Sequence, residues 1–223
     1  MSGGACRRAA VTAALLVAAE GSAAEAAKPP LRLAPRLWRI VERESGPDNY
    51  FTIVESPEGP FLRADYRYPM KTAVLGVAIP EADRRVAARL TWRWRIGAFP
   101  VDADECTEGK EDSAAAVYVS WRRGLRWYAV KYVWSTTANR GAVCARKRNP
   151  FVAQDTVVLE SAGPTGAWER ESIDLADAFR RHFERGDASA DVPPFMGVGI
   201  MSDGDQTRSR SAADYADFLL ERR

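Results

Sequence analysis

Arginine and tryptophan alternate in the segment from Leu90 to Ile96, which reads Leu-Thr-Trp-Arg-Trp-Arg-Ile. Side chains alternate across an extended strand, so Arg93 and Arg95 share one face and the two tryptophans share the other. A guanidinium offers a planar fork of donors that matches a carboxylate or a phosphate. This spacing therefore indicates anion binding on the arginine face and a packed core on the tryptophan face.

The segments 114–121 and 126–135 alternate in the same way and supply two more candidates, Tyr118 and Lys131. If the three segments pair in sequence order as an antiparallel meander, all four polar side chains come together on one sheet face. An acidic sugar suits such a face, because its carboxylate would bind arginine and its ring would stack on tyrosine. We therefore predict a ligand-binding face formed by Arg93, Arg95, Tyr118 and Lys131.

Two other interpretations of these segments stay open. The charged face is also compatible with an ordinary solvated surface of an antiparallel sheet. Inverting the faces would instead line a groove with Trp92, Trp94 and Trp134, which would stack on neutral glycan rings. The inverted arrangement is disfavoured because it buries unpaired arginines, at several kcal/mol each.

A group of acidic residues follows the apolar segment 195–202, where the chain reads Asp-Gly-Asp-Gln-Thr. Asp203 and Asp205 resemble the opening of a calcium loop, since Ca²⁺ prefers several oxygen ligands. Later positions lack the glycine and the terminal glutamate of an EF-hand, which favours a turn in which Asp203 bonds its own backbone. Ca²⁺ at these two aspartates remains a candidate, and no other cofactor is expected.

Catalytic motifs are missing from the sequence. It contains no Gly-x-Ser-x-Gly elbow, phosphate-binding loop or metalloprotease helix, so no residue is assigned a catalytic role. One enzymatic alternative stays open, namely an envelope-polysaccharide lyase or hydrolase. As a lyase it would use Tyr118 or Lys131 as the base, with an arginine neutralising the carboxylate of the substrate.

A mainly β fold must position these residues. Short aromatic and β-branched segments alternate with Gly and Pro turns through residues 37–223, and helical spacing is confined to a segment that Asp174 can cap and Gly186 can end. This pattern predicts an antiparallel two-sheet sandwich of jelly-roll, galactose-binding-like type with one short helix. Residues 28–36 are rich in proline and predict a linker, and residues 37–223 predict a single domain.

The first 27 residues read as an export signal. Arg7 and Arg8 precede an apolar run from Ala9 to Ala19, and small residues follow, with cleavage expected after Ala24 or Ala26. The run is too short to span a bilayer, and no later segment approaches that length. We therefore expect a periplasmic or secreted protein, exported by either the general or the twin-arginine route.

Export would leave Cys106 and Cys144 as the cysteines of the mature chain. Two cysteines in an oxidising compartment predict one disulfide, worth roughly 3–4 kcal/mol by loop-closure entropy; two separate buried thiols are the alternative. The 32 basic and 30 acidic residues nearly cancel, which argues against a nucleic-acid partner because such proteins need a net basic field.

Several motifs in this order resemble a bacterial exported family, the domain-of-unknown-function family 3047. They are Trp92-Arg93-Trp94-Arg95, the run from Glu111 to Val119, Tyr132 to Ser135, Gly166 to Glu169, Gly199 to Asp205, and Asp214-Tyr215. The resemblance covers most of the mature chain and implies an exported β-rich domain, but it supplies no activity. The chain departs from the family pattern at 206–211, which weakens a metal site there.

These observations predict a non-catalytic binding domain for a glycan or another anionic component of the cell envelope. Besides the enzyme described above, a structural or assembly protein that binds a protein partner through a sheet edge stays an alternative.

Overall fold

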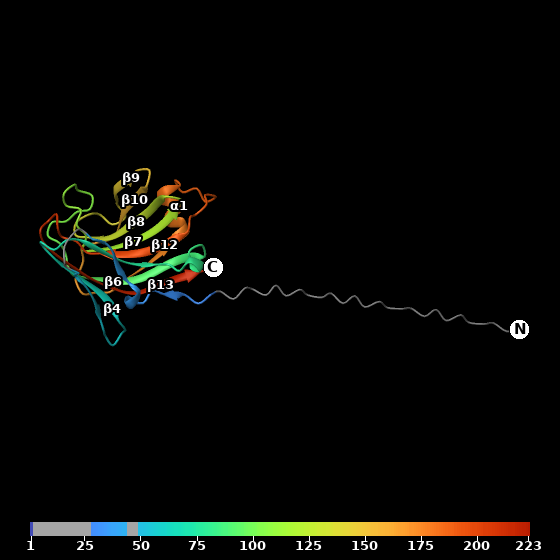
Figure 1. The fold of residues 1–223 in the computed structure, drawn as a ribbon, viewed down its shortest axis with the longest axis horizontal. Coiled ribbons are helices and arrows are strands. Elements are labelled where there is room, and N and C mark those ends of the chain that lie inside the picture. The colour runs from blue at the N-terminus through green and yellow to red at the C-terminus, as the bar shows by residue number, and fades with distance from the viewer. Residues whose placement is uncertain (2–27, 44–48) are drawn as a thin grey trace.

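The structure, a computed structural model, describes Met1, residues 28–43 and residues 49–223. The expected export signal, apart from Met1, lies outside the described residues. Two β-sheets pack face to face, and α1 (Leu175–Phe183) lies at one end of the sandwich (Figure 1). No helix in the described ranges is long and apolar enough to cross a membrane.

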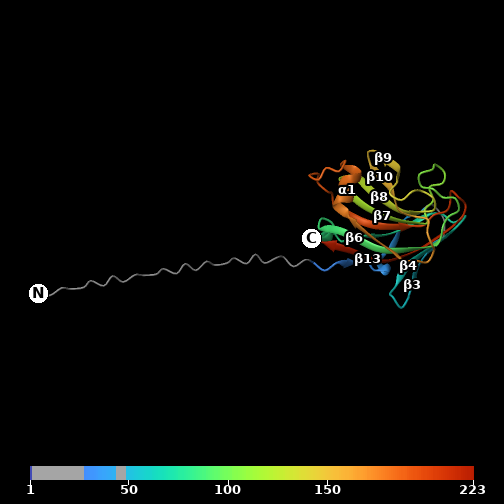
Figure 2. The ribbon, with the colours of Figure 1, turned by 180° about the vertical axis from the view of Figure 1, so that it is seen from behind.

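The first sheet, here called sheet A, is antiparallel, with the order β11-β6-β13-β4-β3 and with β1 also paired to β13. Figure 2 shows its β3–β4 hairpin at the edge. Its strands are β1 (Leu31–Arg32), β3 (Phe51–Val54), β4 (Phe61–Arg67), β6 (Ala87–Ala98), β11 (Glu169–Asp174) and β13 (Arg210–Arg222).

The second sheet, sheet B, has the order β2-β5-β12-β7-β8-β10-β9. Its strands are β2 (Arg39–Arg43), β5 (Ala73–Ala78), β7 (Ala115–Arg123), β8 (Arg126–Ser135), β9 (Val143–Arg148), β10 (Val152–Ser161) and β12 (Phe195–Met201). Two short 3-10 helices, η1 (Pro35–Leu37) and η2 (Glu81–Asp83), complete the elements of the described residues.

The core lies between the two sheets. Trp92 and Trp94 of β6 are fully buried there, and their rings meet Tyr132 and Trp134 of sheet B. The predicted inward direction of the tryptophans of β6 is therefore confirmed, and the inverted arrangement with a tryptophan-lined groove is wrong. Burial of such large aromatic surfaces is the main source of stability for a sandwich of this size.

The predicted two-sheet sandwich of jelly-roll type with a short helix is confirmed, since successive strands β4, β5, β6 and β7 alternate between the sheets. Its strictly antiparallel character is wrong at one place, because β10 pairs with β8 in parallel. The chain reaches this arrangement by passing first through β9, which lies at the edge of the sheet and pairs antiparallel with β10.

The expected meander of 90–96, 114–121 and 126–135 is wrong. β6 pairs with β11 and β13 in sheet A, whereas β7 and β8 pair with each other in sheet B. Alternation shows which side chains of a strand are buried but not which sheet the strand joins. Residues 99–114 form a connection long enough to cross between the sheets.

Local sequence sets the start of α1. Asp174 caps α1, because its carboxylate accepts hydrogen bonds from the amides of Ala176 and Asp177 at 3.0 Å, as predicted.

The segment expected to be a linker, 28–36, instead contains β1 and part of η1. Leu33 within it is buried, and its amide donates to the carbonyl of Phe218 at 3.0 Å.

Candidate functional site

The four residues predicted to form one ligand-binding face lie on opposite sides of the molecule. Arg93 and Arg95 are on the outer face of sheet A, while Tyr118 and Lys131 are paired neighbours on the outer face of sheet B. The aromatic core separates the two pairs. The single predicted site is therefore wrong, and each outer face has to be considered separately.

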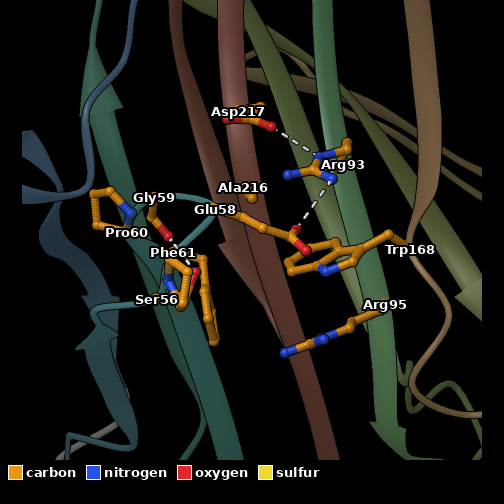
Figure 3. Close-up of a pocket in the computed structure, with 11 residues that line it drawn as sticks. Ser56, Glu58, Gly59, Pro60, Phe61, Arg93, Arg95, Trp168, Ala216 and Asp217 are labelled. Carbon is orange, nitrogen blue, oxygen red and sulfur yellow. Dashed lines mark hydrogen bonds and ion pairs between the residues drawn. The ribbon is translucent and has the colours of Figure 1, made fainter.

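A hollow on the outer face of sheet A, called the sheet A hollow, is formed by the loop 56–60 together with Phe61, Arg93, Arg95, Trp168 and Asp217 (Figure 3). Its volume is about 220 Å³. The ring of Trp168 lies between the two guanidinium groups, whose Cζ atoms are 5.0 Å and 4.5 Å from its centroid. Both arginines therefore already make cation–π contacts.

Aspartates of β13 neutralise the arginines of this hollow. Arg93 donates through Nε to Asp217 at 2.7 Å, and Arg95 donates through Nε to Asp214 at 2.8 Å. Arg63 of β4 binds Asp214 with two hydrogen bonds of 2.7 and 2.9 Å. A carboxylate or phosphate ligand would have to displace these partners, so the arrangement does not suit the predicted anion site.

A bulge in β13 explains how two aspartates reach the same face. The register against β6 shifts between Ala216 and Leu219, and Asp217 adopts a φ of 53°. This is the left-handed region, which aspartate tolerates better than most residues. The extra residue turns Asp217 toward Arg93, whereas regular alternation would place it on the core side.

A larger cavity, called the sheet B groove, crosses the outer face of sheet B and has a volume of about 530 Å³. Its walls include Val41, Tyr118, Trp127 and Gln154. Its floor consists of small residues from four adjacent strands, namely Gly76 and Ala78 of β5, Gly197 and Gly199 of β12, Ser120 of β7 and Ala129 of β8.

Strand register produces this floor. Gly199 lies opposite Gly76 on one side and Tyr118 on the other, and Gly197 lies opposite Ala78 and Ser120. Small side chains are thus neighbours across three strands, which leaves a depression in the sheet surface. Gly197 is also required by close packing, because a Cβ there would lie 2.8 Å from the carbonyl oxygen of Val77.

Aromatic and polar groups border the groove. Trp127 is 40% exposed, and Tyr118 is half-buried at the opposite wall. Ser120 donates its hydroxyl to the carbonyl of Gly197 at 3.1 Å, and Gln154 adds an amide. Flat aromatic surface with a few polar groups can hold a ring-shaped ligand that has apolar faces and hydroxyl edges.

Lys131 does not line this groove, although sequence reasoning placed it in the ligand site. Its side chain is buried, with Nζ 4.0 Å from Oδ2 of Asp203 and 5.9 Å from the ring of Tyr118. Burial alone would lower the pKa of Lys131, but Asp203 and neighbouring acidic groups raise it above its ordinary value. Lys131 therefore keeps its charge in the interior, beside Asp203.

The buried partner of Lys131 has an altered acidity of its own. Burial raises the pKa of Asp203 to about 7, while Lys131 and a hydrogen bond from the amide of Ser113 act in the opposite direction. That hydrogen bond is 2.7 Å long. The expected turn in which Asp203 bonds its own backbone is therefore wrong, because its carboxylate reaches across to the start of β7.

Asp203 and Asp205, the candidate calcium ligands, lie together with Asp112, and their ligand oxygens are within 4.8 Å of one another. Sequence reasoning did not join Asp112 to this pair because it is distant in the chain. Asp112 accepts hydrogen bonds of 2.7 Å from the amide and the hydroxyl of Thr207. These oxygens suit Ca²⁺, but Lys131 and backbone donors already compensate much of their charge, so a calcium site stays a prediction.

The predicted disulfide is confirmed. Cys106 and Cys144 are bonded, with their Cα atoms 4.7 Å apart. The bond fastens the connection between β6 and β7 to β9, above a small second core that includes Ala116, Val133 and Met201. Val74 and Tyr118, which line the groove, pack against this second core.

Residues 38–219 match the family described as Protein of unknown function (DUF3047), and the chain belongs to this family, as the resemblance in the sequence indicated. No curated protein matches the chain at a significant level.

Similar solved structures include carbohydrate-binding modules and glycoside hydrolases. The family 11 carbohydrate-binding module of the cellulase Lic26A-Cel5E of Clostridium thermocellum has a TM-score of 0.46 at 9% identity, covering 87% of this chain and 95% of its own. The xyloglucanase domain of NopAA from Sinorhizobium fredii has a TM-score of 0.43 at 8% identity, covering 85% and 100%. Endoglucanase 3 of Trichoderma harzianum, from family GH12, has a TM-score of 0.41 at 10% identity, covering 78% and 83%.

Proposed function

We propose that this protein is a non-catalytic glycan-binding domain that holds a saccharide chain in the sheet B groove. The observation that carries the proposal is the groove itself, in which Trp127 and Tyr118 border a floor of small residues over about 530 Å³. A pyranose ring has an apolar face that packs on aromatic rings and hydroxyls that need polar partners. Ser120 and Gln154 supply such partners.

The sheet A hollow is a weaker candidate for the same role. It is less than half as large as the groove, and the arginines there are bound to aspartates and stacked on Trp168. A sugar would have to disrupt these contacts before it could use the tryptophan ring. In the sheet B groove, Trp127 has one such contact, with Arg122, and no carboxylate lies among the described residues that line the groove.

Binding without turnover is favoured by the chemistry of the groove lining. Glycoside hydrolysis uses a pair of positioned carboxyl groups, whereas no aspartate or glutamate is found among the described residues that line the groove. The lyase alternative needed Tyr118 or Lys131 beside Arg93 or Arg95. Those arginines lie on the other sheet, so that set of residues is not assembled.

An extracytoplasmic location is part of the proposal. It is supported by the charge, length and small-residue pattern of residues 1–27 and by the Cys106–Cys144 disulfide, since stable disulfides belong mainly to oxidising compartments. Fractionation of cells that express the full chain would test it. Recovery of the uncleaved chain in the cytoplasm would contradict this part of the proposal.

The binding proposal is tested by calorimetric titration against a panel of neutral and acidic oligosaccharides. We expect Trp127→Ala to weaken binding at least about tenfold, because stacking on the indole is lost. Trp168→Ala is the matched control on the other face and should leave affinity unchanged. Absence of binding to every member of the panel, or equal losses in the two variants, would refute the proposal.

A further inference from the structure

The sheet B groove continues into a second cavity at its end near β12. This cavity, called the arginine end, has a volume of about 460 Å³ and shares Arg84 and Met196 with the groove. Arg85 and Arg122 also line it. An occupant of the groove therefore lies directly beside a group of guanidinium side chains.

Backbone hydrogen bonds hold the arginine end in place from two directions. The turn that carries Arg84 is joined to β12, because the amide of Phe195 donates to the carbonyl of Arg84 at 2.9 Å. Arg122 at the end of β7 donates its amide to the carbonyl of Pro194 at 3.3 Å. The arginines thus come from separate segments that are both anchored to the same stretch of chain.

Their positive charges face little compensating charge. Arg84 donates Nε–H to the carbonyl of Ile79 at 2.9 Å, and Arg122 donates Nε–H to the carbonyl of Gly124 at 2.8 Å. Both acceptors are neutral. Among the described residues that line the cavity, Glu81 is the one with a carboxylate, so the cavity has an excess of positive charge.

The arginine end adjoins the aromatic wall of the groove. Arg85 and Arg122 are exposed, and Arg122 lies with Cζ 5.3 Å from the ring of Trp127, which links the arginine end to the aromatic wall of the groove. The bonds described for Arg84 and Arg122 engage Nε, and the forked ends of guanidinium groups are the part that matches carboxylate, sulfate or phosphate oxygens.

We infer that the arginine end binds an anionic substituent of the same glycan whose rings occupy the sheet B groove. The ligand class is therefore an acidic polysaccharide, with carboxylate, sulfate or phosphate groups as the shared chemistry. This inference rests on the proposed function and narrows it. Charge complementarity carries the inference, because the groove itself is largely apolar and the excess positive charge is confined to one end.

Calorimetric titration with matched pairs of oligosaccharides tests the inference. One pair is an oligogalacturonide and its carboxyl-reduced, neutral form; a second pair is a sulfated oligosaccharide and its desulfated form. We expect the acidic member of at least one pair to bind roughly tenfold more tightly, as a charge-assisted hydrogen bond implies, and the difference to shrink with added salt. The pair that shows the preference identifies the anion.

Variants locate the effect. Arg85→Gln and Arg122→Gln should each reduce the preference for the acidic member severalfold, and Arg85→Gln leaves the contact with Trp127 intact. Arg170→Gln, an exposed arginine of β11 on the other sheet, makes the same charge change and should preserve the preference.

The outcomes separate the two proposals. Equal affinity for acidic and neutral members, or a preference that both arginine variants retain, overturns the inference and leaves glycan binding standing if Trp127→Ala still weakens it. Acidic binding that needs the arginines but not Trp127 upholds the arginine end and overturns the proposed function. Binding to no member of either pair overturns both.

Discussion

Two groups of arginines on the two sides of this sandwich differ in what surrounds them. Arg63, Arg93 and Arg95 on sheet A are each bonded to an aspartate of β13, and aromatic rings lie between them. At the arginine end, beside sheet B, Arg84 and Arg122 have bonds to neutral carbonyl groups, and the cavity they line contains Glu81. The first group joins strands, whereas the second leaves positive charge at the surface.

The comparison shows that residue type sets only the capacity to bind an anion. Whether that capacity serves a ligand or the fold depends on carboxylates contributed by other strands. In sheet A, Asp214 lies on the strand between those that carry Arg63 and Arg95, so one carboxylate fastens three strands. Of the four predictions below, three test this division and one concerns the buried pair of Lys131 and Asp203; they run from the largest expected effect to the smallest.

Asp214→Ala should lower the free energy of unfolding by about 3 kcal/mol, because it leaves Arg63 and Arg95 without a buried partner. This is the low end for a broken buried pair, since both arginines reach solvent. Urea denaturation measures the change. Glu81→Ala at the arginine end is the control and should cost less than about 0.5 kcal/mol; similar losses in both would erase the distinction.

Stability should fall as the pH rises from 5 to 8 because of Asp203. Its pKa is about 7 in the folded protein, above the ordinary value, so the folded state holds this proton more tightly than the unfolded state does. The stabilisation is complete at low pH and is lost on passing through pH 7, by about 2 kcal/mol. Asp203→Asn should flatten the decline in urea-denaturation profiles; an unchanged slope would contradict this account.

Trp168→Ala should cost about 1 kcal/mol of unfolding free energy, because cation–π contacts with Arg93 and Arg95 are lost at a partly exposed site. Differential scanning calorimetry would show this as a lower melting temperature. Glycan affinity should remain at the wild-type level. A loss of affinity without a loss of stability would reverse the roles assigned to the two faces.

Arg85→Gln should change the free energy of unfolding by less than about 0.5 kcal/mol, because the side chain is exposed. Arg95→Gln, the same substitution on sheet A, should cost clearly more because it breaks the hydrogen bond to Asp214. Parallel urea titrations of the two variants make the comparison direct. Equal stability changes would show that the two groups of arginines do not differ as described.

Local pattern predicted much of the fold. Alternation in 90–96 correctly separated inward tryptophans from outward arginines, and the N-cap of α1 and the disulfide were also predictable. The end of α1 was placed too late, because the helix stops at Phe183 with Glu184 as its C-cap and not at Gly186. The choice of sheet for β6 was not, because it depends on pairing with β13, far along the chain. The aspartates that neutralise Arg93 and Arg95 come from that same strand, so the ion pairs of these two arginines could not be predicted either.

The groove was missed for a different reason. Its signal in the sequence is the placement of glycine and alanine at every second position in 76–78 and 197–199. Considered one strand at a time, such small residues indicate only a weaker strand. Only the register of β5, β12 and β7 turns these separate gaps into one floor. Trp127 carries no signal of its own in the sequence, because an outward tryptophan beside the buried Tyr128 fits an ordinary exposed position of a strand.

The floor of the sheet B groove is built largely from main chain, so almost no side-chain torsional freedom is lost there when a ligand binds. Immobilising long side chains on binding costs up to about 2 kcal/mol each, and Gly76, Gly197 and Gly199 have none to immobilise. The bottom of the groove therefore acts as a rigid mould, shaped before any occupant arrives. Evolution or engineering can change what it accepts mainly by altering its rim.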